Sequence, residues 1–236
     1  MNRISRKHNF KVDFDGQTLI GDIISTRSQP KVLILHGAGD ASRDNFRLFR
    51  EQLLINGIAS AAFDFVGHGD TGGDLKRSSL VSRTRQTCRV LSSVNIEQPF
   101  SVIAASMGGY TAVKLLEYYP VKNLILVVPA MYDSKAYKVP FNKGFTQIIR
   151  RPQSWDDSDA WQVLSEYKGR LFIVAAEKDD VIPLAVVNKI YDSAVSAEKR
   201  LRFIAPRASH AVFTDLRSKN PEMFCSVFGQ IVEMLA

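Results

Sequence analysis

The chain of 236 residues has little cysteine and little histidine: Cys88 and Cys225 are its two cysteines, and four histidines are present. The two cysteines lie far apart without metal-ligand spacing, which argues against a disulfide scaffold and against a cysteine-based metal site. We therefore expect two reduced, buried thiols.

Long apolar runs are also missing. No stretch reaches the roughly 18–20 apolar residues that a bilayer crossing requires. The first eight residues, MNRISRKH, lead into mixed polar sequence instead of the apolar segment of a signal peptide. The sequence thus predicts a soluble, cytoplasmic protein with no membrane span.

The composition is that of a globular protein, with 45% hydrophobic, 23% charged and 10% aromatic residues. The length predicts a single domain, 1–236. Lys and Arg number 31 against 24 Asp and Glu, but no stripe of bases interleaved with aromatics suggests nucleic-acid binding. We interpret the local group of bases as a solvated face: Lys76, Arg77, Arg83, Arg85 and Arg89.

Short apolar runs alternate with amphipathic stretches along the chain, and this alternation predicts an α/β fold with a mostly parallel sheet and helices on both faces. An antiparallel hairpin is expected first. The predicted strands are Phe10–Phe14, Leu19–Ser25, Val32–Leu35, Ile58–Phe65, Phe100–Ala105, Leu124–Val128, Leu171–Ala176 and Leu201–Ala205. The predicted helices are Arg43–Asn56, Ser78–Ser93, Met107–Tyr119, Leu184–Val195 and Pro221–Met234.

One connection, residues 130–169, is far longer than the two to six residues or so of an ordinary connection and is predicted to be a small, mainly helical cap over the carboxyl edge of the sheet. It is rich in aromatic residues. Two interpretations remain open: these residues pack the cap onto the sheet, or some of them line a substrate pocket. The substrate-binding candidates are Phe141, Phe145, Trp155 and Trp161.

The segment Ala104–Gly109 follows a predicted buried strand and opens a helix. Small residues flank Ser106, as a sharp strand-to-helix turn with an exposed serine requires. The helix that follows offers unpaired N–H groups at its first turn, so the N–H of Met107 is placed to face an oxyanion.

A second glycine turn, His36-Gly37-Ala38-Gly39, ends an earlier strand. Its small residues let the main chain approach a substrate carbonyl, and Ala38 is the expected second oxyanion donor. Asp64 and His68 lie in the turn after the next strand, and we interpret both as structural.

A base and an acid are expected after later strands. His210 follows the last predicted strand, whereas the other three histidines lie in the N-terminal tail or within glycine turns. His210 is therefore the candidate base for Ser106. The loop after Leu171–Ala176 supplies carboxylates.

Together these segments resemble the α/β-hydrolase family: His36-Gly37, Asp64 with Gly67-His68-Gly69, the turn at Ser106, Asp179 four residues before Pro183, and Ser209-His210. The resemblance implies a Ser–His–Asp triad that cleaves esters, thioesters or occasionally amides through an acyl-enzyme, without metal or organic cofactor. It assigns the acid to Asp179, with Asp133 and Asp180 as alternatives. Size and turn sequences are similar to intracellular esterases of the monoacylglycerol-lipase and feruloyl-esterase types. Ala104 stands where many members have glycine.

The leading hypothesis is a serine hydrolase of small, moderately apolar carboxylic esters or thioesters. Acyl transfer, peracid formation or cofactor-free lyase chemistry could use the same serine. A non-catalytic binding module is the third possibility, disfavoured by the presence of all three triad residues. The expected partner is a small-molecule ester or thioester, not a nucleic acid; monomer and homo-oligomer both remain open.

Overall fold

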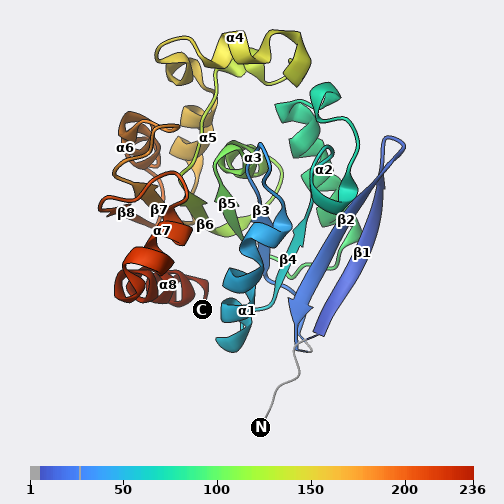
Figure 1. Ribbon diagram of the computed structural model, residues 1–236, viewed down its shortest axis with the longest axis vertical. Helices are drawn as coiled ribbons and strands as arrows, with labels where there is room; N and C mark the ends of the chain where they lie inside the picture. The colour runs from blue at the N-terminus through green and yellow to red at the C-terminus, as the bar shows by residue number, and fades with distance from the viewer. Residues whose placement is uncertain (1–5, 27) are drawn as a thin grey trace.

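The computed structural model describes residues 6–26 and 28–236 and contains an eight-stranded sheet in the order β1-β2-β4-β3-β5-β6-β7-β8 (Figure 1). β1 pairs with β2, and β2 with β4, in antiparallel fashion, and every later pair is parallel. The α/β-hydrolase fold predicted from the sequence is confirmed, including the antiparallel hairpin at the start.

The elements follow one another with short connections outside the cap. The strands are β1 Arg6–Phe14, β2 Gln17–Ser25, β3 Val32–Leu35, β4 Ser60–Phe63, β5 Phe100–Ala105, β6 Val121–Val127, β7 Arg170–Ala176 and β8 Lys199–Ala205. The helices are α1 Arg47–Ile55, α2 Leu80–Ser93, α3 Met107–Leu115, α4 Thr146–Ile149, α5 Ala160–Glu166, α6 Leu184–Ser193, α7 Val212–Lys219 and α8 Pro221–Leu235. Shorter helical turns are η1 Arg43–Phe46, η2 Gly69–Thr71, η3 Leu75–Arg77, η4 Ser134–Ala136, η5 Phe141–Phe145 and η6 Ser154–Asp157.

Alternate residues of the central strands enter two separate cores, because successive side chains of a strand point to opposite faces. In β3, Leu33 and Leu35 join the core under α2, α3, α5 and α6, whereas Val32 and Ile34 join the core under α1, α7 and α8. The continuous apolar runs in the sequence therefore arise from burial on both faces.

The observed elements differ from the predicted ones mainly at their ends. The predicted helix Arg43–Asn56 is a 3-10 turn, η1, followed by α1, and the helix predicted to reach Tyr119 ends at Leu115. Helix α7 was not predicted, since its sequence VFTDLRSK is short and carries few apolar residues. These differences leave the topology unchanged.

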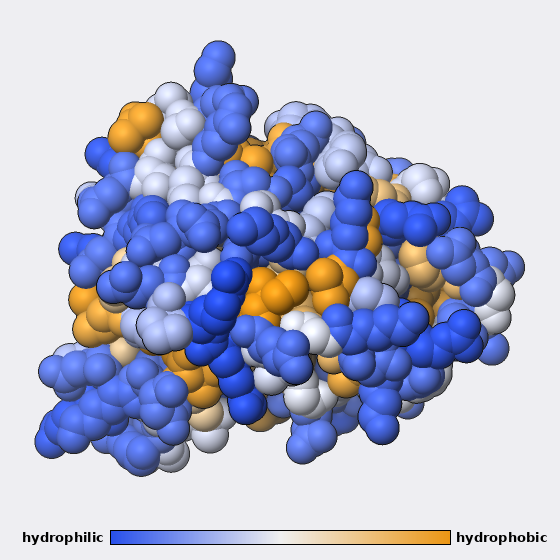
Figure 2. All heavy atoms as spheres, turned by 90° about the horizontal axis from the view of Figure 1, so that it is seen from above, coloured by the Kyte–Doolittle hydropathy of each residue, from blue (hydrophilic) through white to orange (hydrophobic). Residues whose placement is uncertain are grey.

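In the segment 130–169, η4, η5, α4 and η6 follow β6 at the carboxyl edge of the sheet, whereas α5 packs against α3 and α6 beside the sheet, so the prediction of a cap is wrong for this last part of the segment. In Figure 1, α5 lies beside α6, below the part around α4, which lies at the top of the molecule. Viewed from that side, Figure 2 shows a largely hydrophilic surface with small hydrophobic areas. Consistently, none of the large apolar side chains exposed in the described part of the chain belongs to 130–169.

Both cysteines are free, but the expectation that both are buried is wrong: Cys88 is half-buried, and Cys225 is exposed on α8. No helix within 6–26 or 28–236 has the length and apolarity needed to cross a membrane.

Candidate active site

Ser106 lies on a strained turn between β5 and α3, with φ 51° and ψ −122°. A non-glycine residue at positive φ costs energy that the surrounding structure must offset. Here the N–H of Ser106 donates to the carbonyl of Val127 at 3.0 Å, and the carbonyl of Ser106 accepts from Gly109 and Ala130 at 2.9 and 3.0 Å. Backbone bonds on both sides thus fix the turn that presents the hydroxyl.

Glycine is required next to this turn. A Cβ at Gly108 would lie 2.7 Å from the carbonyl oxygens of both Leu35 and His36, so α3 contacts the end of β3 directly. A Cβ at Gly37 would lie 3.1 Å from the Cβ of Ser106. The two glycine segments singled out in the sequence therefore touch each other.

His210, in the loop after β8, contacts both Ser106 and Asp179. Its Nε2 is 3.2 Å from Ser106 Oγ, and its Nδ1 is 3.0 and 2.9 Å from the two carboxylate oxygens of Asp179. The Asp179 side chain is 3% exposed and also accepts the N–H groups of Val181 and Ile182 at 2.9 Å. These bonds orient the carboxylate toward the imidazole.

The two alternative acids lie elsewhere. Asp133 is fully buried at the start of η4, where it accepts the N–H of Lys135 at 2.8 Å and pairs with Arg151 at 2.5 Å. Asp180 is exposed. Asp179 is the carboxylate that the structure brings to His210.

The candidate oxyanion donors border the same serine. Met107 begins α3, and Ala38 follows the glycine that contacts Ser106. Within the described ranges, neither N–H donates to a backbone carbonyl of the chain. Both are therefore available to a substrate oxygen.

A cavity of about 260 Å³ opens at Ser106 and His210. Its walls are the loop after β3, η1 and α1 on one side and the start of α7 on the other. In Figure 1, α1 and α7 lie on the same face of the sheet. The side chains that make it apolar are Ala38, Ala41, Phe46, Phe49, Ala105, Val127, Val128, Ala211, Val212 and Phe213, and its polar members besides Ser106 and His210 are Asn45, Thr214 and Arg217.

The four aromatic candidates of the cap are not among the residues that line this cavity. Phe141 and Phe145 pack edge to face, with ring centroids 4.7 Å apart, and Phe145 is buried. Trp155 and Trp161 pack at 6.4 Å, and Lys189 lies over both rings. In this structure these side chains join the cap to itself and to α6.

Sequence reasoning missed the aromatic wall of the cavity. Phe46, Phe49 and Phe213 were not singled out, because α1 and α7 are more than 150 residues apart and meet through the fold alone. The stacked pair Phe49–Phe213, with centroids 5.1 Å apart, is the contact that joins the two sides. The one available signal was a phenylalanine three residues after His210.

The prediction of a solvated basic face is wrong for one of its residues, because Arg83 is 0% exposed. Helix α2 carries it on its buried side, directly beneath the loop that follows β3. Its contacts are described below.

Asp64 is structural, as predicted. It accepts the N–H groups of Arg43 and Asp70 at 2.7 and 2.9 Å and forms a buried ion pair with Arg43. His68 is structural too, although it reaches Ala41 rather than its own turn, at 2.9 Å. Neither residue contacts Ser106 or His210.

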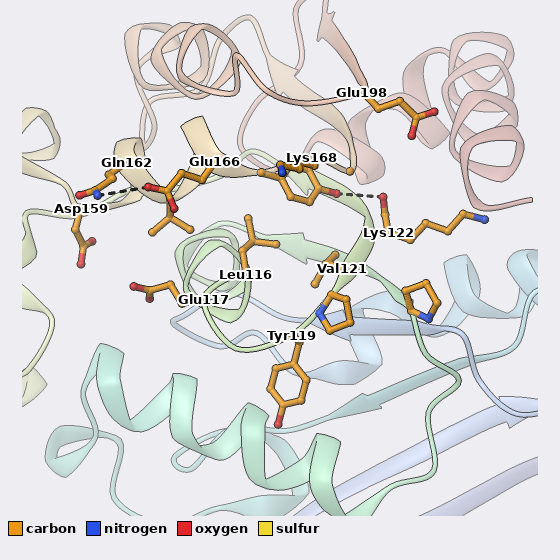
Figure 3. Close-up of a pocket in the computed structure, with 15 residues that line it drawn as sticks. Leu116, Glu117, Tyr119, Val121, Lys122, Asp159, Gln162, Glu166, Lys168 and Glu198 are labelled. Atoms are coloured by element: carbon orange, nitrogen blue, oxygen red, sulfur yellow. Dashed lines mark hydrogen bonds between the residues drawn. The ribbon is translucent and has the colours of Figure 1, made fainter.

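A larger cavity, of about 640 Å³, lies at the opposite edge of the sheet, around the amino ends of β5 to β8 (Figure 3). Among the described residues that line it there is no serine, cysteine or histidine. It therefore offers no nucleophile–base pair, whereas the smaller cavity contains Ser106 and His210. No group of three or more His, Cys, Asp or Glu within 6–26 and 28–236 is arranged to hold a metal ion.

A parallel sheet with a serine on a strained strand-to-helix turn, followed by an acid and a histidine at the same edge, defines an α/β hydrolase. Residues 26–155, more than half of the chain, match the family model described as serine aminopeptidase, S33. The chain belongs to this family of α/β hydrolases. The matched segment includes Ser106 but ends before Asp179 and His210.

Solved structures share the fold across nearly the whole chain. An esterase of Pyrococcus furiosus has 20% identity and a TM-score of 0.72, over 98% of this chain and 94% of that one. A protein of Thermoplasma acidophilum described as a predicted CIB-like hydrolase has 17% identity and a TM-score of 0.69, over 97% and 99%. Est1E of Butyrivibrio proteoclasticus, solved with ferulic acid bound, has 18% identity and a TM-score of 0.69, over 94% and 99%. No curated protein sequence gives a significant match.

Proposed function

We propose that the protein hydrolyses small, apolar carboxylic esters or thioesters through an acyl-enzyme on Ser106. The observation that carries the proposal is the continuous chain of contacts from Ser106 Oγ through His210 to Asp179, at 3.2 and 2.9 Å. A serine hydroxyl is a weak nucleophile until a neighbouring base removes its proton, and His210 Nε2 lies at the distance this transfer needs.

The reaction proceeds in two halves. Ser106 Oγ attacks the acyl carbon while its proton passes to His210 Nε2, and the carbonyl oxygen becomes an oxyanion held by the N–H groups of Ala38 and Met107. The imidazolium then gives its proton to the departing alkoxide or thiolate, which leaves the acyl group on Ser106. Water repeats these steps on the acyl-enzyme and releases the acid. Asp179 holds the imidazole in the required tautomer throughout.

The cavity supports an ester or thioester with a short acyl group. Its volume of about 260 Å³ lies below the lower end of typical ligand sites, about 300 Å³. An aminopeptidase would need a carboxylate to bind the free α-amino group of its substrate. The described lining contains Arg217 and no Asp or Glu, so the cavity does not suit such an ammonium group.

Rates over p-nitrophenyl esters of increasing acyl length, with acyl-thioesters and leucine p-nitroanilide alongside, test this function. We expect hydrolysis of short-chain esters and little release of p-nitroaniline. A fluorophosphonate probe should label the wild type but not Ser106→Ala. Ser134→Ala, which removes an exposed serine of the cap, is the control and should be labelled like the wild type. Ester hydrolysis or labelling that survives in Ser106→Ala would contradict the proposal.

A further inference from the structure

Arg83 is a buried charge that the proposed reaction does not use. Its side chain is 0% exposed, and among the described residues no carboxylate pairs with it. Burying an unpaired guanidinium is costly unless polar groups surround it. The ring of Phe65 lies 3.7 Å from the guanidinium carbon and offsets part of this cost. The hydrogen-bond partners of Arg83 are all in or beneath the loop that carries Ala38.

Arg83 donates to the carbonyls of this loop. Its Nη2 lies 2.7 Å from the oxygen of His36 and 2.9 Å from the oxygen of Gly37. Its Nη1 lies 3.4 Å from Nε2 of His68. One side chain on α2 thus binds two successive peptide groups next to the nucleophile.

Two neutral histidines complete the arrangement. Nε2 of His36 accepts the N–H of Phe65 at 3.1 Å, which leaves the proton on Nδ1 to donate to Gly37 at 2.9 Å. By the same reasoning, His68 accepts from Arg83 and donates from Nδ1 to Ala41 at 2.9 Å. Burial lowers the pKa of His36 well below its usual value and that of His68 to about 4, so both rings are neutral.

The direction of the Ala38 N–H follows from these contacts. In a trans peptide the C=O of one residue and the N–H of the next point in opposite directions. The carbonyl of Gly37 points to Arg83 and His36, so the N–H of Ala38 points away from them. Ala38 lines the cavity of Ser106 on that other side.

We propose that Arg83 is the positioning residue of the oxyanion hole: by binding the carbonyls of His36 and Gly37, it holds the N–H of Ala38 toward the oxygen of the tetrahedral intermediate. Its charge also polarises the Gly37–Ala38 peptide, which strengthens that N–H as a donor. The inference rests on the proposed function, because it presumes a tetrahedral oxyanion at Ser106.

Arg83→Met tests the inference, since it keeps much of the aliphatic stem but removes the charge and the hydrogen bonds. Losing a whole oxyanion donor lowers kcat about 10²–10³-fold. For a donor that is misaligned but present we expect a fall of about 10- to 100-fold, with KM within about threefold. Arg83→Lys, which keeps a charge but has no fork of donors, should lose less.

Arg50 supplies the matched control. It is also a buried arginine, 1% exposed, but it binds the carbonyls of Asp22 and Ser60 and pairs with the Asp22 carboxylate, away from the loop at Ala38. Arg50→Met should lower the urea midpoint and leave kcat of the folded protein near that of the wild type. Equal losses of kcat in Arg50→Met and Arg83→Met would reduce Arg83 to a structural residue and overturn the inference.

A trifluoromethyl ketone provides the readout that a purely structural role would not move, because its serine adduct carries the oxyanion. Its inhibition constant should rise in the two Arg83 variants by the same factor by which kcat/KM falls. Folded Arg83 variants with unchanged kcat and inhibition would overturn the inference.

The amide proton shifts of the wild-type protein provide a test that does not depend on whether the variants fold. On forming the adduct, the amide proton of Ala38 should move downfield by more than that of Met107, which has no guanidinium behind its peptide. An unmoved Ala38 signal would overturn the inference. The proposed function is decided separately by Ser106→Ala, because all Arg83 comparisons are made between enzymes that retain Ser106.

Discussion

Two aromatic-rich regions adjoin the site in sequence or in space, and they use their aromatic side chains differently. In the cap, 130–169, the rings pack on each other, as Phe141 does on Phe145 and Trp155 on Trp161. In the wall formed by η1, α1 and α7, the rings of Phe46, Phe49 and Phe213 line the cavity.

The difference reflects what else stabilises each region. The cap consists of short helical turns whose rings join the core of the sheet and α3: Phe145 packs on Tyr132, and Tyr132 packs on Tyr110. The wall is already held by the sheet and α8, where Phe224 and Val227 are buried. Its rings pack on one another as well, as Phe49 does on Phe46 and Phe213, but they also border the cavity of Ser106. In this chain, aromatic enrichment by itself therefore does not mark the residues that line the cavity.

The largest expected effect is on kcat, and it distinguishes Asp179 from the cap carboxylate Asp133. Asp179→Asn should leave the fold intact and lower kcat about 10²–10⁴-fold, through a wrong imidazole tautomer and an unstabilised imidazolium. Asp133→Asn should instead weaken the contact between η4 and Arg151 and lower the urea midpoint, with kcat nearly unchanged. Stopped-flow rates and urea unfolding check both variants. A large loss of kcat in Asp133→Asn, with kcat nearly unchanged in Asp179→Asn, would assign the catalytic acid to Asp133 instead.

The next effect concerns substrate choice. Phe213→Ala should change the preference between short and long acyl chains by about 1–3 kcal/mol in kcat/KM, because it removes an apolar wall of the cavity. Trp161→Ala should lower thermal stability and leave the preference unchanged. If Trp161→Ala alters acyl preference and Phe213→Ala does not, the cap is the specificity region.

A smaller effect follows from pH. His68 supports Ala41 of the wall, whereas the cap contains no histidine. Because burial lowers the pKa of His68 to about 4, the unfolded chain binds more protons than the folded one below about pH 6.5. The free energy of unfolding should therefore fall by about 1 kcal/mol between pH 7.5 and 5.5 through this residue.

His68→Gln checks this expectation, since its amide can accept from Arg83 and donate to Ala41 without titrating. Urea unfolding at both pH values should show a weaker pH dependence in this variant. An identical pH dependence in the two proteins would exclude His68 as its source.

The smallest effect is on the attachment of the cap. Lys189 of α6 lies over both tryptophan rings and pairs with Asp156 at 2.5 Å. Partly exposed cation–π contacts contribute about 0.5–1 kcal/mol. Lys189→Met should lower the melting temperature slightly and leave esterase rates unchanged, and a change in kcat would show that the cap communicates with Ser106.

Most of the fold could be predicted, because buried parallel strands such as Val32–Leu35 are visible as continuous apolar runs bounded by glycine turns. The loops that carry Ser106, Asp179 and His210 could be predicted for a related reason, although the choice of Asp179 among the carboxylates came from the resemblance to the α/β-hydrolase family. Each follows a strand, and the carboxyl ends of parallel strands meet at one edge. These are local features of the sequence that the sheet brings together.

The cavity wall and the support of the oxyanion loop could not be predicted. Both depend on packing between distant elements: Phe49 on Phe213, and Arg83 on the carbonyls of His36 and Gly37. An arginine within a group of bases has the same local sequence whether it is solvated or buried. Whether Arg83 is buried depends on which face of α2 contacts the loop after β3, and only the three-dimensional arrangement shows this.

The close contact of Gly108 with the end of β3 has a consequence for how such a protein can diversify. Since no side chain intervenes between the turn at Ser106 and the carbonyls of Leu35 and His36, the nucleophile and both candidate oxyanion donors behave as one rigid body. Their spacing is inherited from the backbone of the central sheet. Within 130–169, Ala130 donates to the carbonyl of Ser106, and Asp159 accepts from Tyr110 and Lys114 of α3. Insertions and repacking that keep these contacts can therefore accumulate without altering the geometry of attack, and the rest of the cap is free to evolve toward new roles while the chemistry stays constant.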